Sequence, residues 1–273
     1  MNTQPIGVLD SGIGGLTTVK KLVQLLPGED IIYLGDTNRI PYGSRPKEEI
    51  IEFARQDAAF LTELNIKAMV IACNTVSSAA FDILNNACNI PVFETITPSV
   101  KKAVRLTENG RIGVIGTTAT INSGIYKAAL QTTSPRLRVF SAACPRFVEM
   151  VENDRTDADD EQVVDVAEKY LADIRESGID TLILGCTHFP MLTTVISKVV
   201  GEDIKQVDSG SEAAVFTARA LGTLGLLRKK ETGGTVKYFV TGKKEIFSGI
   251  ASRFMGSDIS GAVETVKLIL RLL

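Results

Sequence analysis

Two cysteines, Cys73 and Cys186, stand in matching surroundings in this sequence. Cys73 directly follows the apolar run of residues 69–72, and Cys186 follows residues 182–185. Polar residues and a helix-like stretch come after each thiol, so each sulfur is expected near the N-terminus of a helix. The partial positive charge at such a position stabilises a thiolate, which predicts a lowered thiol pKa.

A pair of thiols facing one cleft suits the inversion of a carbon stereocentre. Inversion without a cofactor requires one group to remove a proton from one face of the carbon and another group to deliver a proton to the opposite face. A free cysteine has a pKa of about 8.5, so modest tuning gives one thiolate and one thiol. Hydrogen-bond donors must also stabilise the charge that develops on a substrate carboxylate, and Asn74, Thr75 and Thr187 are candidates.

The remaining cysteines, Cys88 and Cys144, do not share this pattern, and we interpret them as small buried apolar side chains. The chain has no C-x-x-C pair, and His188 is its single histidine. We therefore expect no metal site, and the two-thiol chemistry needs no cofactor. His188 fits either a hydrogen-bonded core position or a functional one, and its place two residues after Cys186 favours function.

A glycine-rich turn, Asp-Ser-Gly-Ile-Gly-Gly, occupies residues 10–15. It is not a dinucleotide fingerprint, because that pattern would require glycine at Thr17, and it lacks the Gly-Lys-Ser/Thr of a phosphate loop. The turn follows an apolar run, so Asp10 and Ser11 are predicted to point toward a ligand.

Two further turns have open interpretations. Asp36 and the Pro-Tyr-Gly-Ser stretch of residues 41–44 fit either a capping turn or a substrate loop. Residues 116–120, Gly-Thr-Thr-Ala-Thr, offer hydroxyl and amide groups that fit either a carboxylate site or ordinary helix capping.

The elements that must position these residues alternate between strand and helix. Short Val- and Ile-rich runs, separated by amphipathic stretches of helix length, occur at residues 6–9, 31–34, 68–72, 112–115, 137–140 and 181–184. Continuous apolar runs are typical of parallel strands that helices cover on both faces. We expect a doubly wound α/β fold with its ligand beyond the carboxyl ends of the strands.

The sequence also contains a weak internal repeat. Ile-Gly-Val-Leu at residues 6–9 resembles Ile-Gly-Val-Ile at residues 112–115, and the two cysteine segments resemble each other at a similar offset. We therefore expect two similar doubly wound domains with mainly parallel sheets, related by a pseudo-two-fold axis. Cys73 and Cys186 would then approach one cleft from opposite sides.

Composition narrows the class of partner. The 273 residues carry 30 basic and 32 acidic side chains, a net charge of −2, which favours neither nucleic acid nor an anionic membrane surface. No signal segment and no apolar run of roughly 18 residues is evident, so we expect a cytoplasmic protein that acts on a small molecule.

With these motifs the chain resembles the glutamate racemases, a family that makes D-glutamate for bacterial peptidoglycan. The resemblance runs nearly end to end and rests on residues 10–16, 41–43, 72–75, 116–120 and 185–190. It implies that Cys73 is the base acting on D-glutamate and Cys186 the base acting on L-glutamate. It further implies assisting roles for Asp10, Asp36, Glu152 and His188, where Glu152 is matched only by its distance after residues 143–145.

The resemblance also implies which residues contact the substrate, how the chain is divided and how it assembles. The first domain would comprise residues 1–98 and 208–273, the second residues 99–207, and the protein would be a homodimer. The implied substrate contacts are Asp10, Ser11, Pro41, Tyr42, Gly43, Ser44, Asn74, Thr75, Thr117, Thr118, Thr120, Thr187 and His188.

Two rival interpretations stay open at this point. A racemase of aspartate or another small amino acid would use the same pair of thiols, and a non-catalytic amino-acid-binding protein would close a similar cleft without needing cysteines. A cysteine phosphatase is excluded, because the arginine of C-x5-R is replaced by Ala79 after Cys73 and by Leu192 after Cys186.

Overall fold

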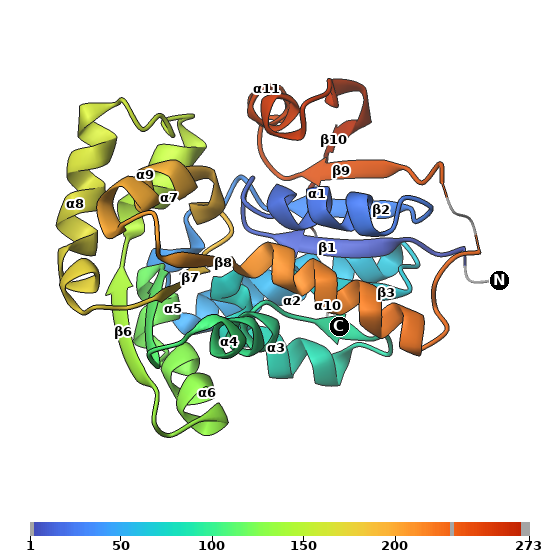
Figure 1. Cartoon of the computed structure of the whole chain (residues 1–273). Helices are drawn as coiled ribbons and strands as arrows, with labels where there is room; N and C mark the ends of the chain where they lie inside the picture. Colours follow the sequence, from blue (N-terminus) through green and yellow to red (C-terminus); the bar gives the residue numbers. More distant parts are fainter. Residues whose placement is uncertain (1–2, 230–231, 269–273) are drawn as a thin grey trace.

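The computed structural model describes residues 3–229 and 232–268 of the chain. It contains two sheets that lie side by side, each flanked by helices (Figure 1). Every strand pairing in the two sheets is parallel. The predicted α/β class with two doubly wound, mainly parallel units is confirmed.

The first sheet has six strands in the order β10-β9-β2-β1-β3-β4. Its strands are β1 (Ile6–Asp10), β2 (Ile31–Gly35), β3 (Ala68–Ile71), β4 (Val92–Phe93), β9 (Val236–Val240) and β10 (Val263–Thr265). The segments that connect these strands include α1 (Leu16–Leu25), η1 (Tyr42–Ser44), α2 (Lys47–Glu63), α3 (Asn74–Ala87), α11 (Lys244–Met255) and η3 (Ser260–Ala262).

The second sheet has four strands in the order β6-β5-β7-β8. They are β5 (Arg111–Gly116), β6 (Arg138–Ala143), β7 (Thr181–Gly185) and β8 (Lys205–Asp208). Its connections include α5 (Thr118–Asn122), α6 (Ile125–Thr133), α7 (Pro145–Glu152), α8 (Glu161–Glu176), η2 (Phe189–Leu192) and α9 (Thr193–Val200).

The two sheets share one strand order, since β2-β1-β3-β4 in the first corresponds to β6-β5-β7-β8 in the second. Cys73 directly precedes α3 after β3, and Cys186 directly follows β7, the equivalent strand. The internal repeat therefore has a structural counterpart.

Two helices cross between the sheets. α4 (Ile96–Leu106) follows β4 of the first sheet but packs on α6, β7 and β8 of the second. Conversely, α10 (Ser209–Thr223) follows β8 but packs against α1, β3 and β4. The same two helices also contact each other. This reciprocal exchange joins the halves along one side and leaves the carboxyl ends of their strands facing each other.

All six predicted strands are present, with bounds that differ by up to three residues. Their residues are continuously buried in β1, β2, β3 and β7, as expected of strands with helices on both faces. By contrast, β6 is half-buried at the edge of the second sheet.

Candidate active site

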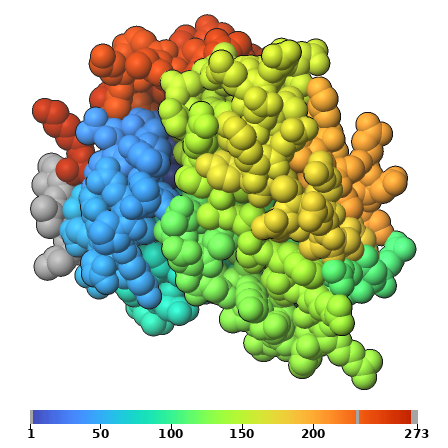
Figure 2. All heavy atoms as spheres, turned by 90° about the vertical axis from the view of Figure 1, so that its left-hand side faces the viewer, coloured from blue at the N-terminus to red at the C-terminus, as the bar shows by residue number. Residues whose placement is uncertain are grey.

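Cys73 and Cys186 line one small cavity between the two halves, whose volume is about 10 Å³. Its wall also contains Ser11, Ile40, Tyr42, Gly43, Asn74, Thr75, Thr117, Val148, Thr187 and His188. This volume is about that of one water molecule. On the face of the molecule shown in Figure 2, the N-terminal part of the chain, in blue, meets the green and yellow atoms of the second half along a narrow seam.

Cys73 precedes the first turn of α3 and is buried, with its sulfur 3.5 Å from Ser11 Oγ. Burial raises the pKa of Cys73 to about 12, and the neighbouring Asp10 adds to the rise. The lowered pKa predicted from the helix N-terminus is therefore wrong for this closed state. Loss of hydration and a nearby carboxylate outweigh the partial charge of the helix.

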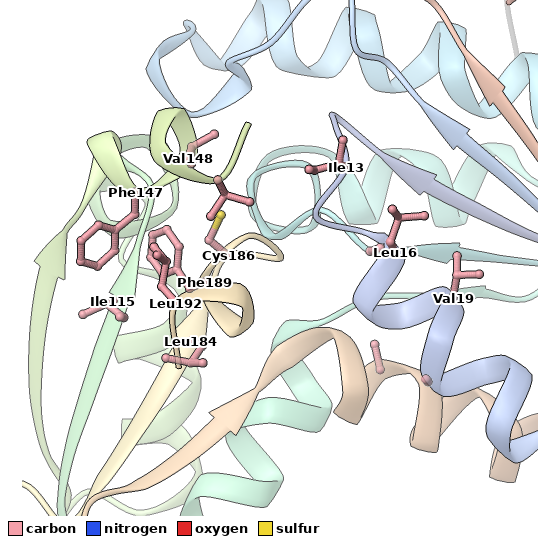
Figure 3. Packing of buried hydrophobic residues seen from close by; sticks show 14 of the residues in the cluster. Ile13, Leu16, Val19, Ile115, Phe147, Val148, Leu184, Cys186, Phe189 and Leu192 are labelled. Carbon is pink, nitrogen blue, oxygen red and sulfur yellow. The ribbon is translucent and has the colours of Figure 1, made fainter. Parts of the chain in front are cut away.

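Cys186 lies just beyond the end of β7, with Phe189 and Leu192 beside it and Val148 of α7 near its sulfur (Figure 3). Ile13, in the loop after β1, lies on the opposite side of the site in the same view. One side of Cys186 therefore packs against apolar side chains, and its sulfur has a polar contact with His188.

His188 connects Cys186 to an acidic side chain. Its Nδ1 lies 3.6 Å from Cys186 Sγ, and its Nε2 lies 2.6 Å from Glu152 Oε1. Burial disfavours the imidazolium, but the hydrogen bonds with Cys186 and Glu152 outweigh it, so the pKa of His188 is well above its usual value of 6.5. A protonated His188 can donate one N–H to the thiolate and the other to Glu152.

Asp10 links the two halves at the end of β1. Its Oδ2 accepts the backbone N–H of Gly12 at 3.0 Å, and its Oδ1 accepts the hydroxyl of Thr187 at 3.2 Å. Burial raises the pKa of Asp10, while the nearby His188 and the Gly12 N–H oppose the rise. Asp10 thus lies between the two thiol environments.

Asp36 does not line the cavity. It lies behind Tyr42, whose hydroxyl donates to Asp36 Oδ2, and it also accepts the Thr241 hydroxyl at 2.6 Å. Arg39 forms an ion pair with the same carboxylate. The structure therefore gives Asp36 contact with the cavity wall rather than with the cavity itself.

Three threonine hydroxyls meet across the seam between α3 and α5. Thr75 Oγ1 lies 2.9 Å from Thr117 Oγ1 and 3.5 Å from Thr120 Oγ1. Thr117 caps α5 by accepting the backbone N–H of Thr120 at 3.2 Å. Of the two interpretations of residues 116–120, helix capping is confirmed, and Thr117 also lines the cavity.

Asn74 lines the cavity, but both ends of its amide are engaged elsewhere. Its Nδ2 donates to the Tyr126 hydroxyl at 2.7 Å, and its Oδ1 accepts the Ser209 hydroxyl at 3.1 Å. Ser209 Oγ also lies 2.8 Å from the carbonyl oxygen of Leu184 on β7. Asn74 therefore connects the strand end that carries Cys73 to the second sheet.

Five of the predicted substrate contacts do not line the small cavity, and neither does Glu152. The five are Asp10, Pro41, Ser44, Thr118 and Thr120. Ser44 and Thr118 line an adjoining hollow of about 760 Å³, which shares Gly43 with the cavity. Pro41 and Glu152 line another hollow of about 430 Å³.

Sequence reasoning missed several residues of this site. Ile40 and Val148 line the cavity, and the buried Tyr33 donates its hydroxyl to the carbonyl oxygen of Gly12 at 2.5 Å. Ile40 directly precedes the Pro-Tyr-Gly stretch, so its proximity to that motif could have indicated a place in the site. Val148 and Tyr33 gave no signal, because an apolar or aromatic residue within an element looks like core.

Within residues 3–229 and 232–268, no cluster of three or more His, Cys, Asp or Glu side chains is arranged to hold a metal ion. None of the helices in the same ranges combines the length and apolar character that a bilayer-spanning segment needs.

Residues 6–217 match the family described as Asp/Glu/Hydantoin racemase. This is the class of protein that the two-sheet fold and the paired thiols define. Glutamate racemase from Geobacter metallireducens is 41% identical over 268 residues, which cover 98% of each chain.

Solved structures of glutamate racemases are also similar to this chain over nearly its full length. A glutamate racemase isoform from Bacillus anthracis is 39% identical with a TM-score of 0.94, over 99% of this chain and 100% of its own. The Francisella tularensis glutamate racemase, solved in complex with D-glutamate, is 38% identical with a TM-score of 0.90, over 98% and 99%. The chain belongs to the glutamate racemases.

Proposed function

We propose that this chain interconverts L-glutamate and D-glutamate by moving protons at Cα between two thiols, without a cofactor. The observation that carries the proposal is that Cys73 and Cys186 follow equivalent strands of two repeated sheets and line one cavity. Opposed acid–base groups at one carbon are what stereochemical inversion requires.

The two thiols have different surroundings, which supports different roles. Cys186 has a histidine whose pKa is raised, so an imidazolium can stabilise its thiolate. Cys73 is favoured as the neutral thiol, because burial and Asp10 raise its pKa to about 12. In this state Cys186 takes the proton of L-glutamate while Cys73 delivers one to the other face. The reverse reaction starts from a Cys73 thiolate and D-glutamate.

The other predicted residues divide into assisting groups and substrate contacts. Asp10, Glu152 and His188 set the charge around the thiols, and Asp36 acts through Tyr42. Hydroxyl and backbone N–H groups at Ser11, Gly43, Thr75, Thr117 and Thr187 would hold the substrate carboxylates. Pro41, Ser44, Asn74, Thr118 and Thr120 complete the proposed binding surface.

Catalysis requires the two halves to separate, because a cavity of about 10 Å³ cannot admit glutamate. The proposed domains are residues 1–98 with 208–273 and residues 99–207, and the exchange of α4 and α10 between the sheets supports these bounds. If the two halves hinge at the side where α4 and α10 cross, opening would widen the seam between η1 and α5. Closure would then exclude water around the thiols.

The biological setting follows from the same proposal. D-glutamate from this reaction would supply peptidoglycan synthesis in the cytoplasm, where free thiols persist. The four cysteines of the chain are unpaired in the structure, which is consistent with a reducing compartment. We also propose that the protein works as a homodimer, as the family resemblance implies.

The direct test is to incubate the purified protein with L-glutamate in D2O. Optical rotation should fall to zero while the Cα proton signal is lost to solvent deuterium. The matched control is Cys88→Ala, which removes a half-buried cysteine outside the cavity and should leave both rates unchanged. Success with aspartate alone would transfer the chemistry to another substrate, and silence with both acids would favour a binding protein.

A further inference from the structure

Two fully buried carboxyl groups meet at one phenol behind the cavity wall. Asp36 follows β2, and Asp57 lies on α2. The hydroxyl of Tyr42 contacts Asp36 Oδ2, and it also lies 3.1 Å from Asp57 Oδ2. Arg39 contacts both carboxyls, with its Nη2 3.1 Å from Asp57 Oδ1. The proposed reaction assigns no role to Asp57.

The protons in this group can be counted. A phenol carries one O–H and can donate to one acceptor, whereas an ionised carboxylate can only accept. Asp36 accepts from Arg39, from Tyr42 and from the Thr241 hydroxyl. The contact between Asp57 Oδ2 and the Tyr42 oxygen then has a proton only if Asp57 supplies it.

The charges point the same way. Two ionised carboxylates, both fully buried, and one partly exposed guanidinium would leave a net negative charge on buried groups, which is costly. The negative charge of Asp10 adds to the cost of ionising Asp57. Burial, followed by Asp36, raises the pKa of Asp57 well above its usual value against the opposing effect of Arg39. With Asp57 neutral, Arg39 and Asp36 balance.

We propose that Asp57 is a positioning residue that carries a proton and donates it to the oxygen of Tyr42. Tyr42 in turn donates to Asp36, so the phenol is fixed from both sides. Tyr42 begins η1, and a side chain added at the next residue, Gly43, would lie 2.4 Å from Thr117 Cβ. The proton on Asp57 therefore helps to hold η1 in the position that closes the cavity against α5.

An infrared measurement tests the proton without any reference to activity. The difference spectrum between the wild-type protein and Asp57→Asn at neutral pH should show loss of a carbonyl stretch from a protonated carboxylic acid. The matched control is Glu48→Gln, an exposed acid-to-amide change on the same helix, which should leave that band in place. Persistence of the band in Asp57→Asn, or its loss in Asp36→Asn instead, would overturn the proposal.

Kinetics test the positioning role, and this part rests on the proposed function. The side-chain amide introduced by Asp57→Asn can donate an N–H to Tyr42 and accept from Arg39, so this variant should keep kcat/KM within about threefold and an unchanged pH profile. Asp57→Ala leaves the phenol oxygen and Arg39 without a partner and should raise KM about tenfold or more, with a smaller change in kcat.

Equal impairment of the Asn and Ala variants, with unchanged circular dichroism, would contradict the positioning role. If Asp57→Ala fails to fold, the Asn variant and the infrared band decide. A wild-type protein that is inactive on glutamate would refute the proposed function while leaving the infrared result to judge the proton on Asp57.

Discussion

His188 and Glu152 connect the second thiol, Cys186, to the first half of the chain. His188 Nε2 lies 2.6 Å from Glu152 Oε1, and the same carboxylate oxygen accepts the backbone N–H of Ile13 from the first half at 3.2 Å. Glu152 retains 19% exposure of its side chain, whereas His188 is almost fully buried. The charge state beside Cys186 is therefore coupled to closure of the two halves.

Substitution Glu152→Gln should lower the pKa of His188. The neutral amide keeps a hydrogen-bond acceptor but removes the negative charge that favours the imidazolium. His188 is the single histidine of the chain, so one imidazole resonance in an NMR titration of the untagged protein reports it directly. Glu149→Gln, an exposed change on the same helix, is the control. An unchanged titration in Glu152→Gln would disprove the coupling.

The same pair predicts a pH dependence of stability. The folded-state pKa of His188 is raised, so its contribution to stability is fully present below the unfolded value of about 6.5 and is lost as pH rises through the folded value. Urea unfolding above about pH 6.5 should show this decline in the wild type. In Glu152→Gln the decline should be smaller, and equal slopes would contradict the prediction.

Cys73 predicts a second decline at higher pH. Its folded-state pKa is about 12 against about 8.5 in an unfolded chain, so the folded state retains the proton longer and stability falls as pH rises above about 8.5. Between about pH 8.5 and pH 10 the loss amounts to about 2 kcal/mol. Cys73→Ser removes this titration and should flatten the curve of unfolding free energy by that amount. Parallel curves for the two proteins would show that the pKa of the Cys73 thiol is not raised in the folded state.

Gly43→Ala tests the contact between η1 and α5. A Cβ at this position would lie 2.4 Å from Thr117 Cβ and 2.7 Å from Thr117 Cγ2, so one segment must shift. Displacement of a cavity wall by about 1 Å can reduce activity roughly 100-fold, and kcat/KM should fall accordingly. Gly249→Ala, in an open position on α11, is the control and should leave activity unchanged. Wild-type activity in Gly43→Ala would mean that the closed wall is dispensable.

The fold was largely predictable because its signals are local. Buried parallel strands such as Ile31–Gly35 read as uninterrupted apolar runs. The two-residue strand β4 and the polar strand β8 carry no such signal, and the structure reveals them through pairing with β3 and β7. The exchange of α4 and α10 depends on which sheet each helix contacts, which a linear pattern does not encode.

The candidate site was predictable where a polar residue directly follows an apolar run, as at Cys73 and Cys186. Asp57 was missed because a lone acid inside an amphipathic helix looks solvent-exposed, and only the packing of α2 buries it against Asp36 and Arg39. The pKa of Cys73 was mispredicted for a related reason. A helix N-terminus is visible in sequence, whereas burial and the approach of Asp10 are tertiary.

Each thiol is proposed to serve one face of Cα, and single-cysteine variants in D2O test this assignment most directly. Cys73→Ala and Cys186→Ala should each abolish racemisation of both enantiomers. Cys73→Ala should exchange the α-proton of L-glutamate only, through Cys186, and Cys186→Ala that of D-glutamate only, through Cys73. Full turnover by either variant, or exchange of both enantiomers by one remaining thiol, would contradict the two-thiol mechanism.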